Sequence, residues 1–370
     1  MTTSELERPV SDQGARAARK AFHPLTVAAV TPLCDDAAAV TFAVPEHLRE
    51  LFDFAAGQSL TLRRVVDGIE HRRSYSICSP AGSAPRIGVR EIPDGLFSRW
   101  LTREVRPGDV VEVQPPTGSF RADPTEGGRH LCIAAGSGIT PMLSIASTVL
   151  THPEARVTLL YGNRTTASVM FAEELADLKN RHTGRFELVH ALSREPRDVE
   201  LFSGRLDAPR LRRMLDVLVP LQVVDHVWLC GPFEMITAAR ELLTELGVPA
   251  DRVHAELFYV DEPPPEVHRP DPGAAADGET SAVTLTVDGR TTTAAHPRDR
   301  TILDAAAATR GDLPFACKGG VCGTCRALVR TGEVDMRRNY ALGDDEVERG
   351  FVLTCQTHPV SDTVEIDFDA

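Results

Sequence analysis

The hydrophobic pattern of the chain changes twice, which divides it into three parts. In residues 22–126, short runs of β-forming residues are separated by turn residues, a spacing typical of a small antiparallel barrel. The clearest runs are His23–Val30, Ala39–Val44, Gln58–Arg63 and Val110–Val113. One stretch with a helical pattern, Leu96–Glu104, interrupts them. We therefore predict an antiparallel β-barrel with one inserted helix.

Residues 127–260 show the alternation of buried strands and helices that is typical of an α/β domain with a parallel sheet. The buried-strand runs are His130–Ala135, Val157–Tyr161, Phe186–His190 and His226–Cys230. Helical patterns lie between them, at Phe171–Arg181 and Phe233–Leu246. The pattern predicts an α/β domain with a parallel sheet, in which ligands bind at the carboxyl ends of the strands.

A shorter mixture of strands and one helix fills residues 281–370 and predicts a small α+β domain. Before it, residues 261–280 contain five prolines and predict an extended linker, which would let the last domain swing. Residues 1–21 are polar and charged, so we expect a disordered tail and no signal peptide.

Four cysteines in the last part have the spacing of a plant-type [2Fe–2S] cluster. Cys317, Cys322 and Cys325 stand at C-x4-C-x2-C, and Cys355 follows after 29 residues. A tight loop over the cluster needs backbone conformations that other residues resist, and three glycines lie there: Gly319, Gly320 and Gly323. A zinc site would normally show two matched pairs, and a disulfide framework suits short secreted chains. We therefore predict that all four cysteines bind iron.

The composition is that of an ordinary globular protein, with 42% apolar and 25% charged residues. The net charge of −13 argues against a nucleic-acid partner. No run approaches the roughly 18 apolar residues of a membrane-spanning helix, so we expect no membrane partner. The other four cysteines are scattered singly, as buried thiols usually are, and beside an oxygen-sensitive cluster they predict a cytoplasmic location.

Two segments of the predicted barrel carry residues suited to a flavin. Arg73, Tyr75 and Ser76 lie on a probable strand, where alternation places Arg73 and Tyr75 on one face. An arginine can hold a pyrophosphate bidentately, and a tyrosine can pack on a flat ring. Gly95–Ser98 opens the inserted helix, whose N-terminal amides attract phosphate. Both patterns also occur on ordinary strands and helix starts.

The α/β part contains a glycine-rich loop and arginines at strand ends. Gly136–Pro141 follows a strand and opens a helix, with Thr140 predicted as the N-cap. Its glycines allow a pyrophosphate to approach, although the fingerprint G-x-G-x-x-G is not matched. Arg164 and Ser193–Arg194 follow later strands, where arginine either neutralises a 2′-phosphate or is simply solvated. Cys230–Pro232 ends a further strand at the same edge.

Taken in this order, the motifs resemble those of the ferredoxin–NADP reductase superfamily with a plant-type ferredoxin domain fused at the C-terminus. The resemblance covers the chain from about residue 22 and extends to reductase components of oxygenases of the phenylacetyl-CoA epoxidase type. The closer likeness rests on Tyr161–Thr165, Met170–Phe171, Ala176–Lys179, Asp312–Cys322, Asn339–Leu342 and Asp367–Asp369. It implies a flavin-binding barrel, a Rossmann-like nucleotide-binding domain and a β-grasp [2Fe–2S] domain.

The resemblance also implies roles for individual residues. Arg73 matches the residue that binds the FAD pyrophosphate, Tyr75 the one that packs on the isoalloxazine, and Ser76 the one near its N5 atom. Cys230 matches the cysteine beside the nicotinamide. Ser193 and Arg194 match the pair that holds the 2′-phosphate of NADPH. The complete set of other residues predicted to contact FAD or NADPH is Gly95, Ser98, Gly118, Gly136, Gly138, Thr140, Arg164, Ser193 and Arg194.

The implied function is electron transfer from NADPH through FAD and the cluster to a separate oxygenase. The resemblance favours a di-iron oxygenase of the phenylacetyl-CoA epoxidase type. Reductases of Rieske-type ring or steroid oxygenases share the domain order and stay an alternative. A non-catalytic redox-sensing subunit would have little reason to keep both a flavin motif and a nucleotide loop. Ser281–Ala370 has 14 acidic and 10 basic residues, so we expect partner docking to be moderately salt-sensitive.

Overall fold

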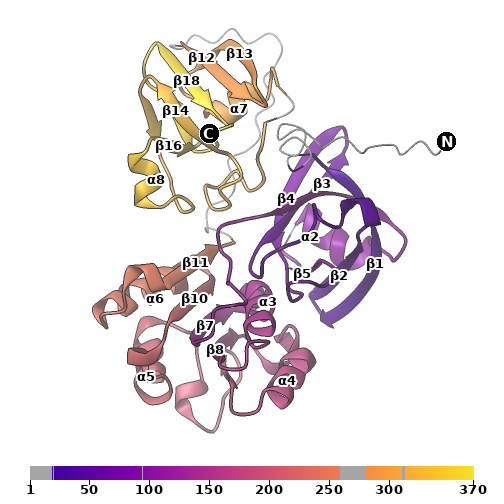
Figure 1. The fold of residues 1–370 in the computed structure, drawn as a ribbon, viewed down its shortest axis with the longest axis vertical. Helices are drawn as coiled ribbons and strands as arrows, with labels where there is room; N and C mark the ends of the chain where they lie inside the picture. The colour runs from indigo at the N-terminus through magenta and orange to yellow at the C-terminus, as the bar shows by residue number, and fades with distance from the viewer. Residues whose placement is uncertain (1–18, 20, 94, 259–279, 311–312) are drawn as a thin grey trace, which may run out of the picture.

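The computed structural model contains a barrel, an α/β domain and a small C-terminal domain (Figure 1). It describes residues 19, 21–93, 95–258, 280–310 and 313–370. The predicted tail and linker, residues 1–21 and 261–280, lie almost entirely outside the described residues. None of the described helices is long and apolar enough to cross a membrane.

Six antiparallel strands form the barrel, in the order β4-β3-β6-β1-β2-β5. They are β1 (His23–Cys34), β2 (Ala37–Ala43), β3 (Ser59–Val66), β4 (Ile69–Ser76), β5 (Arg86–Arg90) and β6 (Val110–Thr117). An isolated bridge between Ile77 and Ile87 joins the end of β4 to β5 and closes the sheet. Buried apolar side chains such as Leu60 and Leu62 of β3 fill the interior.

The helix inserted in the barrel spans the predicted residues, but its second half is a π-helical turn. The α-helix α2 spans Leu96–Arg99, and a π-helical turn, Trp100–Glu104, continues it. The N–H of Val105 donates to the carbonyl of Trp100 at 3.1 Å. The wider turn brings both Leu101 and Val105 into the core, where they are fully buried.

Five parallel strands form the sheet of the α/β domain, in the order β11-β10-β7-β8-β9. They are β7 (Arg129–Ala135), β8 (Arg156–Asn163), β9 (Phe186–Leu192), β10 (His226–Gly231) and β11 (Val253–Leu257). One face packs against α3 (Ile139–Val149) and α4 (Ala172–Arg181), and the other against α5 (Ala208–Leu218) and α6 (Phe233–Glu245). The core under α3 continues into the barrel, where the Phe120 ring meets Trp228 edge-on at 5.3 Å between centroids. One core cluster therefore spans both units, while the interior of the barrel forms a second cluster of its own.

A five-stranded mixed sheet, ordered β13-β12-β18-β14-β16, forms the C-terminal domain with the pair β15-β17. The strands are β12 (Thr280–Val287), β13 (Arg290–Pro297), β14 (Arg326–Thr331), β15 (Val334–Met336), β16 (Phe351–Leu353), β17 (Thr357–Pro359) and β18 (Thr363–Asp367). Its helices are α7 (Ile302–Ala306) and α8 (Asp344–Glu348). Strands β12 and β18 are parallel, and the remaining pairs are antiparallel. The loop with three of the four cluster cysteines connects α7 to β14.

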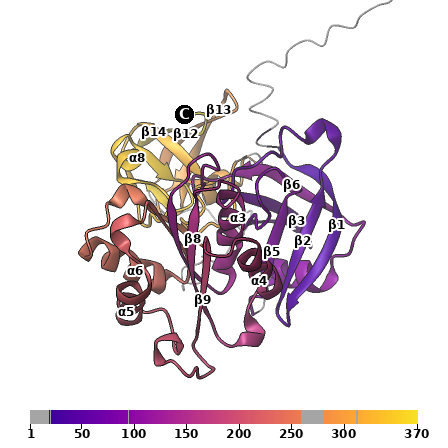
Figure 2. The same ribbon diagram turned by 60° about the horizontal axis from the view of Figure 1, so that its bottom comes forward.

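The C-terminal domain contacts both other units. The Tyr340 ring meets Phe233, the first residue of α6, edge-on at 5.2 Å between centroids. Arg72 of β4 donates a hydrogen bond to the carbonyl of Leu313 at 3.0 Å. Figure 1 shows this domain, drawn in orange and yellow, above the barrel and the α/β domain, and Figure 2 shows it from another side.

Candidate functional site

The four predicted cluster ligands come together in two pairs. The thiols of Cys317 and Cys322 are in hydrogen-bond contact, and so are those of Cys325 and Cys355. Cys322 and Cys325 are close enough for their charges to interact, which joins the two pairs into one group. None of the four is in a disulfide.

This pairing suits a [2Fe–2S] cluster better than a single ion. Each iron of such a cluster takes two protein thiolates and shares two sulfides with the other iron, whereas structural zinc takes four ligands at one point. Within the described residues, no three Cys, His, Asp or Glu side chains converge on one ion position. The arrangement fits one iron held by Cys317 and Cys322 and the other by Cys325 and Cys355.

The loop favours thiolate at Cys317 only, because hydrogen bonding to the partner thiol and burial raise the pKa of Cys322 and of Cys325. The hydrogen bond from Cys322, with backbone N–H groups that include Gly319, lowers the pKa of Cys317 to about 6. Thiolate is the form that binds metal. Gly320 and Gly323 have φ values of 78° and 67°, as predicted for a tight loop. Gly319 does not use such a conformation, so that part of the prediction is wrong; Lys318 does, with a φ of 55°.

The predicted flavin segment lies at the end of β4. Ser76 is buried, and its hydroxyl donates to Oε2 of Glu256 at 2.7 Å. The Tyr75 ring is partly buried beside Phe97, and burial raises the pKa of its hydroxyl. Arg73 is exposed at the edge of the barrel. The strand therefore presents an aromatic ring and a guanidinium to solvent-accessible space and turns Ser76 toward the α/β domain.

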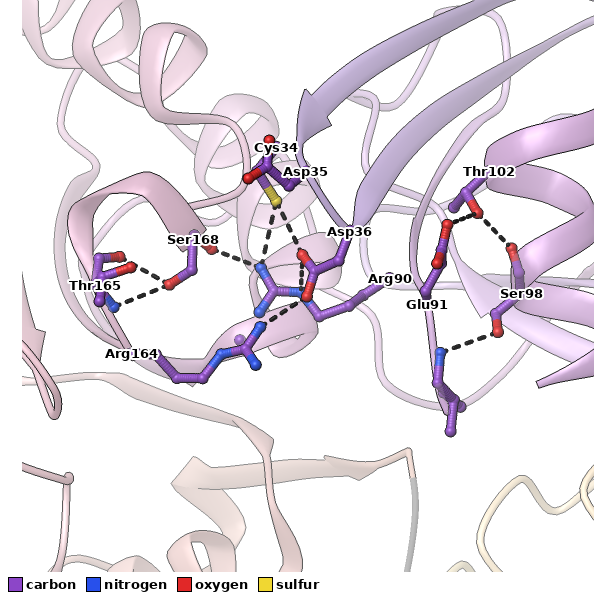
Figure 3. Close-up of polar contacts among 12 residues, drawn as sticks. Cys34, Asp35, Asp36, Arg90, Glu91, Ser98, Thr102, Arg164, Thr165 and Ser168 are labelled. Carbon is purple, nitrogen blue, oxygen red and sulfur yellow. Dashed lines mark hydrogen bonds and ion pairs between the residues drawn. The ribbon is translucent and has the colours of Figure 1, made fainter. Parts of the chain in front are cut away.

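Gly95–Ser98, the second segment predicted to bind the flavin, is held together by its own hydrogen bonds. The Ser98 hydroxyl accepts from the N–H of Ile92 at 3.1 Å and donates to the carbonyl of Gly95 at 3.3 Å. Ser98 lies close to Thr102 of the π-helical turn (Figure 3). A Cβ on Gly95 would lie 2.4 Å from the Ser98 hydroxyl, so glycine is needed here for space. Gly118, after β6, has a φ of 121°, which glycine tolerates best.

A cavity of about 830 Å³ opens at the carboxyl ends of the parallel strands. Four residues predicted to bind the nucleotide line it: Gly136, Arg164, Ser193 and Arg194. Arg205, Phe233 and Phe258 also line it, and the sequence pattern assigned none of them to the nucleotide. This is the edge of an α/β sheet where nucleotides bind.

Gly138 and Thr140 lie behind the cavity wall. A Cβ on Gly138 would lie 2.1 Å from the carbonyl oxygen of Cys230, so this glycine permits close packing of the loop on β10. Thr140 is buried, and its hydroxyl donates to the carbonyl of Ser137 at 2.9 Å. The N-cap of α3 is Gly138, so the prediction of Thr140 as N-cap is wrong.

Arg164 is held by the barrel. Its Nη2 lies 2.7 Å from Oδ2 of Asp36, and Arg90 approaches the other carboxylate oxygen at 3.6 Å (Figure 3). Burial opposes ionisation of Asp36, but the hydrogen bond from Cys34 and the two arginines lower its pKa overall. Arg90 also donates to the carbonyl of Ser168 at 2.5 Å. These bonds tie the β1–β2 turn of the barrel to the loop after β8.

Glu256 is half-buried and joins a polar group that the sequence pattern does not predict. It pairs in register with Cys230 across β10 and β11, and it accepts the hydrogen bond from Ser76. Burial raises the pKa of Glu256 to about 7, and burial with the charge of Glu256 raises the pKa of Cys230. The barrel and the sheet thus bring the three groups together from strands far apart in the sequence.

Three families match successive parts of the chain. Residues 24–122 match the Oxidoreductase FAD-binding domain, residues 132–241 the Oxidoreductase NAD-binding domain, and residues 285–360 the 2Fe-2S iron-sulfur cluster binding domain. These matches confirm the predicted cofactors: FAD, a nicotinamide nucleotide and a [2Fe–2S] cluster.

Individual relatives cover almost the whole chain. It is 43% identical over 354 residues to one of the subunits of 1,2-phenylacetyl-CoA epoxidase from Escherichia coli (strain K12), covering 94% of this chain and 98% of that protein. It is 35% identical over 354 residues to the ferredoxin reductase component of 3-ketosteroid-9-alpha-monooxygenase of Rhodococcus rhodochrous, covering 93% and 96%. The solved structure of phthalate dioxygenase reductase has a TM-score of 0.58 at 24% identity, covering 94% and 98%. The predicted three-part fold is confirmed.

Proposed function

Because this chain belongs to the family of oxygenase reductases that join an FAD-binding barrel, a nucleotide-binding domain and a [2Fe–2S] domain, we propose that it carries electrons from NADPH to a di-iron oxygenase of the phenylacetyl-CoA epoxidase type. The observation that carries this proposal is the 43% identity, over 94% of the chain, to a component of such an epoxidase. The oxygenase would hold the substrate, and this chain would supply electrons only.

When bound, FAD would supply the chemistry of accepting a hydride and passing on electrons one at a time. We assign the FAD pyrophosphate to Arg73 and the flat face of the ring to Tyr75, which share one face of β4. Ser76 and Cys230 meet at Glu256, where the pKa of about 7 allows Oε2 to hold or release a proton near neutral pH. Ser76 orients this carboxyl toward the barrel.

The nucleotide is assigned to the cavity at the sheet edge. Gly136 supplies a turn with a φ of 55°, which leaves room for a pyrophosphate. Ser193, Arg194 and Arg205 line the same cavity and supply a hydroxyl and two positive charges for a 2′-phosphate. Since Arg164 is paired with Asp36, we assign it to joining the barrel and the α/β domain. This set favours NADPH over NADH.

A second candidate partner is a steroid monooxygenase, because the chain is 35% identical to the ferredoxin reductase component of one. To separate the two, NADPH consumption and product formation are measured with each purified oxygenase and its substrate. Coupled NADPH loss and epoxide formation with phenylacetyl-CoA supports the proposal. Turnover only with the steroid oxygenase would replace the proposed partner. Cys355→Ser serves as the control, because it removes a cluster ligand while NADPH-driven ferricyanide reduction through the flavin should persist.

A further inference from the structure

Arg72 is a buried cation on the strand that carries the proposed flavin residues. Only 6% of its surface is exposed, although it lies on β4, at one end of the strand order of the barrel sheet. A buried guanidinium is stable only when its donors are paired. Glu70, two residues earlier on the same strand, accepts from Nε at 2.6 Å and lies 2.5 Å from Nη2. This pairing leaves Nη1 to bind elsewhere.

The third bond of Arg72 crosses to the C-terminal domain. Nη1 donates to the carbonyl of Leu313 at 3.0 Å, across 241 positions of sequence. The guanidinium carbon lies 4.4 Å from the centre of the Phe315 ring and 5.0 Å from that of Phe22. An arginine stacked against aromatic rings and shielded from water is a strong and geometrically specific contact.

Leu313 and Phe315 lead directly into the cluster loop. Cys317, the first cluster ligand, follows Phe315 by two residues, and Lys318 also lies over the Phe315 ring at 5.0 Å. On the barrel side, the residue after Arg72 is Arg73, and Tyr75 follows on the same strand. One strand therefore carries the proposed flavin contacts and the contact to the cluster loop.

We propose that Arg72 docks the cluster loop of this chain on β4, in the position where the cluster receives electrons from the flavin site. Arg72 is a positioning residue, because it acts through its contacts with the loop. Electron transfer slows steeply with distance. Losing this contact therefore lowers the rate of electron transfer to the cluster without changing the rate of flavin reduction. The inference rests on the proposed electron path, but not on which oxygenase is the partner.

The test compares Arg72→Leu with Arg72→Lys and Arg63→Leu. Lysine keeps the charge but lacks the planar guanidinium group, so it should restore only part of the rate of cluster reduction. Arg63 is a matched control: it lies over the Phe22 ring at 4.5 Å and pairs with Glu70 and Glu112, all on the barrel side. FAD and iron contents are measured first for each variant.

Anaerobic stopped-flow mixing with NADPH then follows flavin absorbance, and rapid-freeze EPR follows the reduced cluster. For Arg72→Leu we expect wild-type FAD and iron contents, an unchanged rate of flavin reduction, and cluster reduction slowed by at least about tenfold, equal to about 1.4 kcal/mol. Arg63→Leu should stay within about threefold of wild type at both steps. Cluster reduction at the wild-type rate in Arg72→Leu would overturn the proposal. Equal slowing of flavin reduction and cluster reduction would overturn it too.

A second variant covers the case in which Arg72→Leu loses a cofactor. Phe315→Leu removes the stacking partner from the other side of the contact and should slow cluster reduction in the same selective way. In a chain that already carries Phe315→Leu, adding Arg72→Lys should have less effect than in wild type, because the two residues form one contact. Fully additive effects of the two substitutions on the rate of cluster reduction would count against the proposed contact. Failure of NADPH to reduce the flavin in the wild-type chain would instead refute the proposed function.

Discussion

Replacing Gly138 with alanine tests whether the nucleotide loop depends on its close packing against β10. The new Cβ would lie 2.1 Å from the carbonyl oxygen of Cys230 and 2.5 Å from its carbonyl carbon. Because ordinary contacts begin at 3.4 Å, loop and strand must separate by about 1.3 Å. The obstructing atoms are backbone atoms of a strand paired on both sides, so no side-chain rotation relieves the clash. Overpacking of this kind costs about 1–3 kcal/mol.

Thermal unfolding and NADPH-dependent ferricyanide reduction measure the two consequences. At about 2–4 °C per kcal/mol for a domain of this size, the melting temperature should fall by about 2–12 °C. The KM for NADPH should rise, because the displaced loop includes Gly136 and Ser137 of the cavity wall. Gly127→Ala is the control, since the nearest atom to its Cβ would belong to the His152 side chain, at 2.9 Å, and not to a backbone strand. Wild-type melting temperature and KM in Gly138→Ala would refute the reasoning.

Three further variants test charge and proton placement. Arg194→Gln should lower kcat/KM for NADPH by about 10–100-fold and change kcat/KM for NADH little, because it removes one charged hydrogen bond worth about 1.5–3 kcal/mol. Equal losses with both coenzymes would place Arg194 away from the 2′-phosphate. Burial raises the pKa of Glu256 from 4.5 to about 7, so the wild-type chain loses stability as pH rises from 4.5 through 7. Glu256→Gln should remove that loss, and a melting-temperature difference independent of pH would contradict it. Burial and the charge of His226 lower the pKa of His130 from 6.5 to about 4, so stability falls as pH drops from 6.5 through 4, by up to about 3 kcal/mol. His130→Phe should reduce this loss of stability at low pH. An unchanged dependence of stability on pH would show that other groups cause the loss.

The features that could be predicted from sequence are those whose chemistry is local. The spacing of Cys317, Cys322 and Cys325 within one loop predicts their grouping, because a short chain closes around the cluster. The alternation of apolar runs predicts both the barrel and the parallel sheet. The pattern also predicts the span of the inserted helix but not its π-helical turn at Trp100–Glu104, because that turn depends on how Leu101 and Val105 pack into the barrel core.

The features that could not be predicted depend on contacts between distant segments. Glu256 meets Ser76 across 180 positions, and only the folded sheet places it beside Cys230. Gly138 suggests phosphate binding by its motif, but the structure shows that it also makes room for a neighbouring strand. Arg72 stands beside a flavin motif, and its bond to the C-terminal domain has no sequence signal at all.

The most direct test of the proposed electron path is a single-turnover experiment on the reduced cluster. The purified chain is reduced with NADPH without oxygen, and the EPR signal of the cluster is recorded before and after mixing with an oxygenase, its substrate and oxygen. We predict that the di-iron epoxidase with phenylacetyl-CoA abolishes the signal and yields one epoxide for every two electrons that the reduced chain gives up. A signal that persists with the di-iron enzyme and disappears only with a Rieske-type oxygenase would contradict the account.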